Sequence, residues 1–94
     1  MDVAWTIPAL ADLDQIQDFI GQDSPVAAFR FTFDLVRRTE ALLSVDGTAG
    51  RRGRVAGTRG WVTRGAAYIV VYRIKVWVEV LAVIHAAREW PEGF

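Results

Sequence analysis

Arginine is the residue type that could do most of the chemistry in this sequence. Five arginines fall within fourteen residues and are separated by glycines. They are Arg51, Arg52, Arg54, Arg59 and Arg64. The guanidinium group is a rigid planar fork that binds carboxylates and phosphates through paired hydrogen bonds. The cluster therefore predicts contact with an acidic protein surface or with a nucleic acid, and the plainest alternative is a solvated loop without a partner.

The glycines of this segment, at positions 47, 50, 53, 57 and 60, invite comparison with loops that cradle phosphate groups. They lack the following lysine and hydroxyl residue that contact the terminal phosphates and the metal ion in such loops. Turns and bulges between strands explain the glycines more simply. Aromatic residues that could stack on bases are few, since Trp61 and Tyr68 fit a protein core equally well.

His85 is the single histidine, so it would have to be the general acid or base of any hydrolytic site that needs one. A lone histidine at a strand end is more often a hydrogen-bonded structural residue. No Ser-His-Asp set can be assembled, and Glu79 and Glu89 flank opposite ends of the last predicted strand. The chain has no cysteine and no cluster of histidines and acids that could hold a metal. We therefore expect no cofactor and no metal.

The length of 94 residues predicts one small domain, residues 1–94, and the net charge is zero. The charge is segregated, because residues 1–34 hold six acids and one base while residues 35–94 hold ten bases and five acids. The basic half is suited to an acidic partner. No secretory leader is visible, and no apolar run approaches the roughly 20 residues that span a bilayer. We therefore expect a cytoplasmic protein without membrane contacts.

The first half of the sequence predicts a short strand followed by a helical hairpin. The strand is expected at 3–7, and a helix with apolar residues at helical spacing follows it and ends at Gly21. Ser24 and Pro25 form a cap and a first helical residue, so a second helix should start there and run to about Leu43. The apolar arc of this helix is broader than packing on a sheet requires. We expect it to leave Phe29 or Phe33 for a partner.

The second half predicts an antiparallel sheet, which gives the chain an α+β fold with the helical hairpin packed on that sheet. The expected strands are 54–58, 61–64, 67–74 and 76–84. The strand at 67–74 is nearly all apolar and should be central. The closure of the hairpin near Lys75 is left open, because the glycine or asparagine that tight turns favour is missing there.

These motifs resemble the RelE/ParE superfamily of toxins from bacterial type II toxin–antitoxin systems, and most of all its ParE-like members. The ParE-like pattern runs roughly GR-x-GRV-x-GTRE, then PYIV-x-YRV, then VLH-x-AR-x-WP. Its elements here are Gly50–Arg51, Gly53–Arg54–Val55, Gly57–Thr58–Arg59, Tyr68–Ile69–Val70, Tyr72–Arg73–Ile74, Val83–Ile84–His85, Arg88, Trp90 and Pro91. The resemblance covers most of the chain and is strongest from Gly50 onward.

The resemblance implies one of two activities. ParE-like toxins act on DNA gyrase, whereas RelE-like toxins cut messenger RNA on the ribosome with basic strand residues and a C-terminal tyrosine. At the corresponding basic positions this chain has Ile69, Gly60 and Val62, and its tail has no tyrosine. Each charge-stabilising donor that is missing costs roughly 3–4 kcal/mol of transition-state stabilisation. We therefore favour a ParE-like toxin that inhibits growth by binding a target, DNA gyrase, and needs no direct contact with nucleic acid.

The resemblance and the arginine cluster together suggest where this toxin would bind. We expect the target-binding surface to contain Arg51, Arg52, Arg54, Arg59, His85, Arg88 and Trp90. The alternative, a ribonuclease site, would use Arg64, Arg73, His85 and Arg88. The resemblance also implies a cognate ParD-like antitoxin that forms a hetero-oligomer with the toxin. Two helices cover only one face of a sheet, so the antitoxin should bring apolar anchors for the other face and acidic residues for the arginines.

Overall fold

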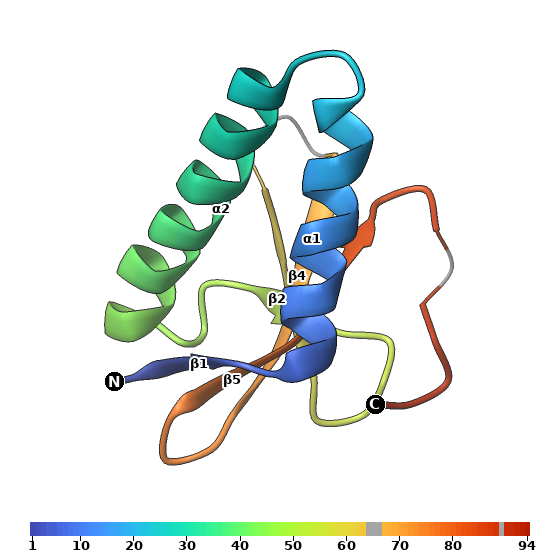
Figure 1. Ribbon diagram of the computed structural model, residues 1–94. Coiled ribbons are helices and arrows are strands. Elements are labelled where there is room, and N and C mark those ends of the chain that lie inside the picture. Colours follow the sequence, from blue (N-terminus) through green and yellow to red (C-terminus); the bar gives the residue numbers. More distant parts are fainter. Residues whose placement is uncertain (64–66, 89) are drawn as a thin grey trace.

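The computed structural model describes residues 1–63, 67–88 and 90–94, and these form two layers, a helical hairpin and a five-stranded sheet (Figure 1). The elements are β1 (Val3–Trp5), α1 (Ile7–Gly21), α2 (Pro25–Val45), β2 (Arg51–Arg52), β3 (Arg59–Val62), β4 (Tyr68–Ile74) and β5 (Val78–His85). The strand order is β1-β5-β4-β3-β2, which places β4 at the centre as predicted. The α+β architecture is confirmed, but β1 runs parallel to β5, so the sheet is mixed and not purely antiparallel.

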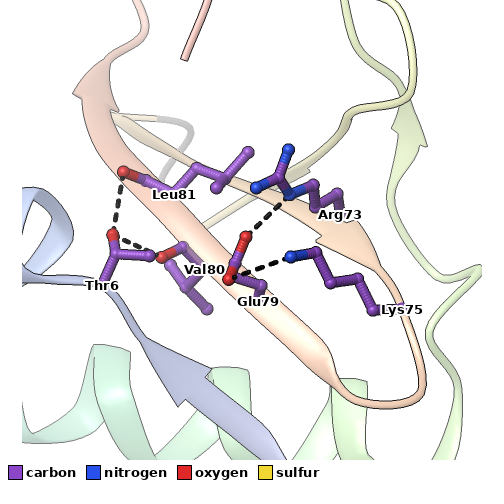
Figure 2. Close-up of polar contacts among 6 residues, drawn as sticks. All are labelled: Thr6, Arg73, Lys75, Glu79, Val80 and Leu81. Carbon is purple, nitrogen blue, oxygen red and sulfur yellow. Dashed lines mark hydrogen bonds and ion pairs between the residues drawn. The ribbon is translucent and has the colours of Figure 1, made fainter.

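Both helices begin at residues whose side chains cap them. Thr6 Oγ1 accepts a hydrogen bond from the Ala9 N–H (3.3 Å), and Ser24 Oγ accepts one from the Ala27 N–H (3.2 Å). Each cap satisfies an N–H group that has no partner within its helix. Thr6 Oγ1 also donates to the carbonyl oxygen of Val80 at 2.9 Å, which fastens the start of α1 to β5 (Figure 2). Because Thr6 caps the helix, β1 ends earlier than the predicted strand at 3–7.

The main core lies between the helical hairpin and the sheet. α1 packs over β5, and α2 contacts α1 and β1. The buried residues of this core are Ala9, Leu13, Ile16, Leu35, Leu43, Val70, Tyr72, Val78, Val80 and Val83. The helical members recur at spacings of three, four or their multiples, and those on β4 alternate along the strand, as each type of element requires. The second helix runs to Val45, slightly beyond the predicted end at Leu43.

The opposite face of the sheet has a smaller core of its own. Val71, Ala82 and Ile84 are buried there, and Ile69 and Trp90 pack against them. The C-terminal tail therefore covers part of the face that the helices leave open. Trp90 is half-buried in this position.

The segment before β3 differs most from the sequence-based expectation. The predicted strand at 54–58 is a turn, because the Gly53 N–H donates to the Thr58 carbonyl oxygen (2.8 Å) and Gly57 has a φ of +79°. Few residues other than glycine adopt that backbone conformation readily. β3 therefore starts at Arg59, ahead of the predicted strand at 61–64, whose last residue lies outside the described residues.

The hairpin between β4 and β5, which the sequence left open, closes through a short loop of Lys75, Val76 and Trp77. The Lys75 N–H donates to the Trp77 carbonyl oxygen at 2.7 Å, and the loop follows directly on the pair Ile74 and Val78. A shift of register beside Val71 increases the local twist of the two strands.

Candidate functional site: an arginine loop fixed to the core

A buried tyrosine holds the start of the segment from Gly50 to Arg59, which is here called the arginine loop. Tyr72 on β4 is 0% exposed. Its hydroxyl accepts a hydrogen bond from the Gly50 N–H (2.9 Å) and donates one to the Gly47 carbonyl oxygen (2.7 Å). A Cβ atom at Gly50 would lie only 2.6 Å from the tyrosine oxygen, so a glycine is needed for this approach. Burial raises the pKa of Tyr72 above its ordinary value of 10.0, and the neutral hydroxyl stays available to both backbone groups.

Three further hydrogen bonds hold the arginine loop in one shape. Thr58 Oγ1 donates to the Val55 carbonyl oxygen (2.6 Å), and the Gly53 N–H donates to the Thr58 carbonyl oxygen (2.8 Å). Arg59 Nη1 donates to the Gly50 carbonyl oxygen at 2.8 Å, which ties the end of the loop to its start. Arg59 is therefore half-buried and acts as a brace for the loop.

Trp90 joins the C-terminal tail to the arginine loop. A Cβ atom at Gly53 would lie 2.9 Å from the Trp90 ring, and one at Gly60 would lie 3.3 Å from it. The Phe94 ring stands edge-on to the Trp90 ring at 6.4 Å between centroids. The indole is thus wedged between the tail, the loop and the smaller core. Trp90 therefore packs against Gly53 and Gly60, and its place in a target-binding surface with the arginines stays a prediction.

Arg51, Arg52 and Arg54 point their charge into solvent. All three are exposed, and the ion pairs among the described residues involve none of them. Arg52, Arg54 and Arg59 line a cavity of about 550 Å³ together with the glycines and small residues of the loop. A rigid loop that presents unneutralised guanidinium groups around a hollow is suited to bind carboxylate or phosphate groups of a partner.

His85 and Arg88 lie in a different place from Trp90. The His85 ring packs edge-on against Tyr68 with 5.3 Å between centroids, at a small cavity that Asp12 and Phe19 of α1 also line. His85 Nδ1 accepts a hydrogen bond from the Ala87 N–H at 3.1 Å, so the neutral imidazole carries its proton on Nε2. The structure therefore places the two C-terminal parts of the predicted target-binding surface in separate environments, His85 and Arg88 beside α1 and Trp90 on the helix-free face.

The residues of the alternative ribonuclease site are not gathered by the described part of the chain. Arg73 Nε donates to Glu79 Oε1 at 2.7 Å, and Lys75 lies 3.6 Å from the same carboxylate (Figure 2). The hydrogen bond from Arg73 lowers the pKa of Glu79 below its usual value. Arg73 pairs with Glu79 near the start of β5, whereas His85 ends that strand, about 20 Å away at 3.3 Å per residue. Arg64 lies outside the described residues.

Two features of the structure were not predicted from the sequence, one on the surface and one in the core. A cleft of about 510 Å³ separates α2 from β3. Its lining includes Phe31, Leu35 and Trp61, with Arg30 and Arg38 as its cations. The role of Tyr72 in holding the arginine loop was also missed, since the sequence shows only an apolar strand there. Phe29 and Phe33 are 62% and 56% exposed, and the contact of either one with a partner stays a prediction.

The fold is that of a toxin of the RelE/ParE superfamily, and comparison with known proteins gives the family. A model of the "ParE toxin of type II toxin-antitoxin system, parDE" matches residues 3–90. The chain belongs to this ParE toxin family. The fold is also similar to a solved structure, "Chromosomal ParDE TA system from P. aeruginosa", with a TM-score of 0.80 and 27% identity over 90% of this chain and 95% of that one.

Two curated relatives are also named as toxins, one of them with a RelE name. A Sinorhizobium fredii protein named "Putative toxin Y4kP" is 39% identical over 90 residues, which cover 96% of this chain and 93% of the relative. "Toxin RelE2" of Caulobacter vibrioides is 36% identical over 88 residues, which cover 92% and 96%. The chain is therefore a ParE-like toxin of a type II toxin–antitoxin system.

Proposed function

We propose that this toxin inhibits growth by binding DNA gyrase in the cytoplasm and that a cognate ParD-like antitoxin neutralises it. The observation that carries the proposal is the arginine loop, in which Arg51, Arg52 and Arg54 are exposed on a backbone that Tyr72 and Arg59 hold in place. A loop that is already ordered loses little conformational entropy on binding, so its charges contribute more fully to affinity. Binding of an acidic surface is the function that this arrangement supports best.

The same geometry gives little support to ribonuclease action. A phosphoryl-transfer site needs cations that converge on one phosphate. Arg73 is paired with Glu79, and His85 stands at the far end of β5 with one ring nitrogen occupied by the backbone. Inhibition by binding requires none of these groups to move a proton.

We propose the cleft between α2 and β3 as the binding site of the antitoxin, in place of the helix-free face expected from the sequence, part of which Trp90 covers. Apolar side chains line it, and its charged residues are Arg30, Arg38 and Asp34, of which the two arginines have no ion pair among the described residues. An antitoxin segment with apolar anchors and acidic residues would satisfy both features. Because such a segment binds only the folded toxin, it would add about 4 kcal/mol of stability at a concentration a thousandfold above its dissociation constant.

The test is to compare the purified chain in two assays, supercoiling by DNA gyrase and cleavage of messenger RNA on ribosomes. We expect inhibition of supercoiling without ribosome-dependent cleavage. The variant His85→Gln should keep its inhibitory activity, because an amide replaces the hydrogen bond of the imidazole and no titration is needed. If the wild type cleaves RNA and folded His85→Gln loses 10²–10⁴-fold of that activity, the effect of removing a general acid or base, the proposal is wrong.

A further inference from the structure

The outer side of the helical hairpin has an apolar groove whose two walls carry charges of opposite sign. On α1, Leu10 and Asp14 line the groove, and Asp18 follows one turn later. On α2, Phe29 and Phe33 line it, and Arg37 follows at the same spacing of four residues. Residues four apart lie on the same side of a helix. The groove therefore has one wall that ends in acids and another that ends in a base.

The centre of this groove exposes large apolar side chains in an ordered arrangement. Phe29 and Phe33 stack with 6.0 Å between ring centroids, and Leu10 across from them is 47% exposed. Thr32 Oγ1 donates to Gln17 Oε1 at 2.7 Å across the floor, so the two walls are held together. A contiguous apolar surface of this kind marks a site of protein association.

The charges on the two helices indicate what covers the groove. α1 has three aspartates and no base, whereas α2 has three arginines, an aspartate and a glutamate. An acidic antitoxin segment laid in the groove would face Asp14 and Asp18, which disfavours it there. Asp14 on one wall and Arg37 beside the other are opposite in charge, so the two walls can pair with each other across a two-fold interface.

We propose that the groove binds a second copy of this chain, so that the free toxin forms a symmetric dimer through its helical hairpins. A two-fold axis along the groove sets α1 of each copy against α2 of the other. The phenylalanines of both copies then share the centre, and Asp14 of one copy faces Arg37 of its partner at each rim. Arg37 has only a loose contact within its own chain, 3.9 Å to the exposed Asp34, so it is available for this pairing. The dimer does not depend on gyrase as the target.

Sedimentation equilibrium on the purified chain, with charge-exchange variants, tests the dimer. The wild type should be dimeric at about 100 µM, a concentration that reveals weak association. Asp14→Arg and Arg37→Asp should each raise the dissociation constant about tenfold or more, because each places like charges together twice in the dimer. The double variant restores opposite charges and should return close to the wild-type value. Arg38→Asp, which alters a charge on α2 that lines the cleft toward β3, is the control and should leave the dimer intact.

Three outcomes would overturn the dimer. A monomeric wild type at that concentration would do so, as would a double variant no better than the single ones, or a control as damaging as Arg37→Asp. Loss of antitoxin binding in the groove variants, together with a monomeric wild type, would show that the antitoxin occupies the groove instead. Inhibition of gyrase by monomeric variants is measured separately, so a failure of the dimer is distinguishable from a failure of the proposed target.

Discussion

Replacement of Tyr72 by phenylalanine isolates the contact that fixes the arginine loop. The change keeps the buried ring and removes only the hydroxyl, which accepts from the Gly50 N–H and donates to the Gly47 carbonyl oxygen. Both backbone groups belong to buried residues and would lose a partner. Each lost hydrogen bond costs about 1–1.5 kcal/mol, and a group left unsatisfied raises that figure. We expect Tyr72→Phe to lower the free energy of unfolding by about 2–3 kcal/mol.

The assay is urea denaturation followed by circular dichroism, with hydrogen exchange at the Gly50 amide as a local readout. Tyr68→Phe is the matched control, because Tyr68 lies on the same strand and its hydroxyl makes no hydrogen bond to any described residue. It should cost less than about 0.5 kcal/mol. Equal costs for the two variants, or unchanged protection of the Gly50 amide in Tyr72→Phe, would refute the role assigned to the Tyr72 hydroxyl.

The same hydroxyl predicts a dependence of stability on pH. Burial raises the pKa of Tyr72 in the folded state, so the folded chain holds this proton more tightly than the unfolded chain does. The resulting stability is fully present below pH 10, the ordinary value, and is lost as pH rises through the folded pKa. Tyr72→Phe has no hydroxyl to ionise and should not lose this part of its stability in alkali. The difference in the free energy of unfolding between the wild type and the variant should therefore become smaller above pH 10.

Two further substitutions have defined outcomes. Glu79→Gln should lower the free energy of unfolding at pH 7 but not in acid. The hydrogen bond from Arg73 lowers the pKa of Glu79, so the stability that this carboxylate contributes is lost as pH falls below about 4.5. Denaturation curves of both proteins at pH 3 and pH 7 measure this, and an equal difference in unfolding free energy at the two pH values would contradict it. Trp90→Ala should cost about 2 kcal/mol by uncovering the smaller core, whereas Arg88→Ala should leave stability unchanged; equal melting temperatures for the two variants would show that Trp90 is not packed as described.

Sequence patterns predicted the parts of the fold whose signal is local. The two helices are predicted by a capping residue with a proline close behind it and by the spacing of their apolar residues, as at Ser24 and Pro25. β4 and β5 are long runs of β-branched residues, so their position was predicted within a few residues. The parallel pairing of β1 with β5 has no local signal, since it joins residues more than seventy positions apart.

The segment at 54–58 forms a turn and not the predicted strand because two local preferences compete in it. Its valine and threonine fit a strand, yet Thr58 bonds back to Val55 and Gly57 takes a positive φ, which closes a turn. The sequence predicted the arginine loop itself but not the contact that holds its start. That contact is made by Tyr72, a residue 22 positions from Gly50. His85 and Trp90 lie in different environments because of the path that the chain takes after His85, and no sequence pattern predicts that path.

Binding of the target by Arg52 and Arg54, held out by the arginine loop, is the main part of the proposed function. Its most direct test is the concentration of purified chain that halves supercoiling by DNA gyrase, measured for the wild type, for a double variant Arg52→Gln and Arg54→Gln, and for Arg38→Gln on α2 as the control. The double variant should need about tenfold more protein or a larger excess, as expected for the loss of arginines at a binding hot spot. The control should match the wild type. A folded double variant that inhibits gyrase as strongly as the wild type would show that these two arginines do not bind the target.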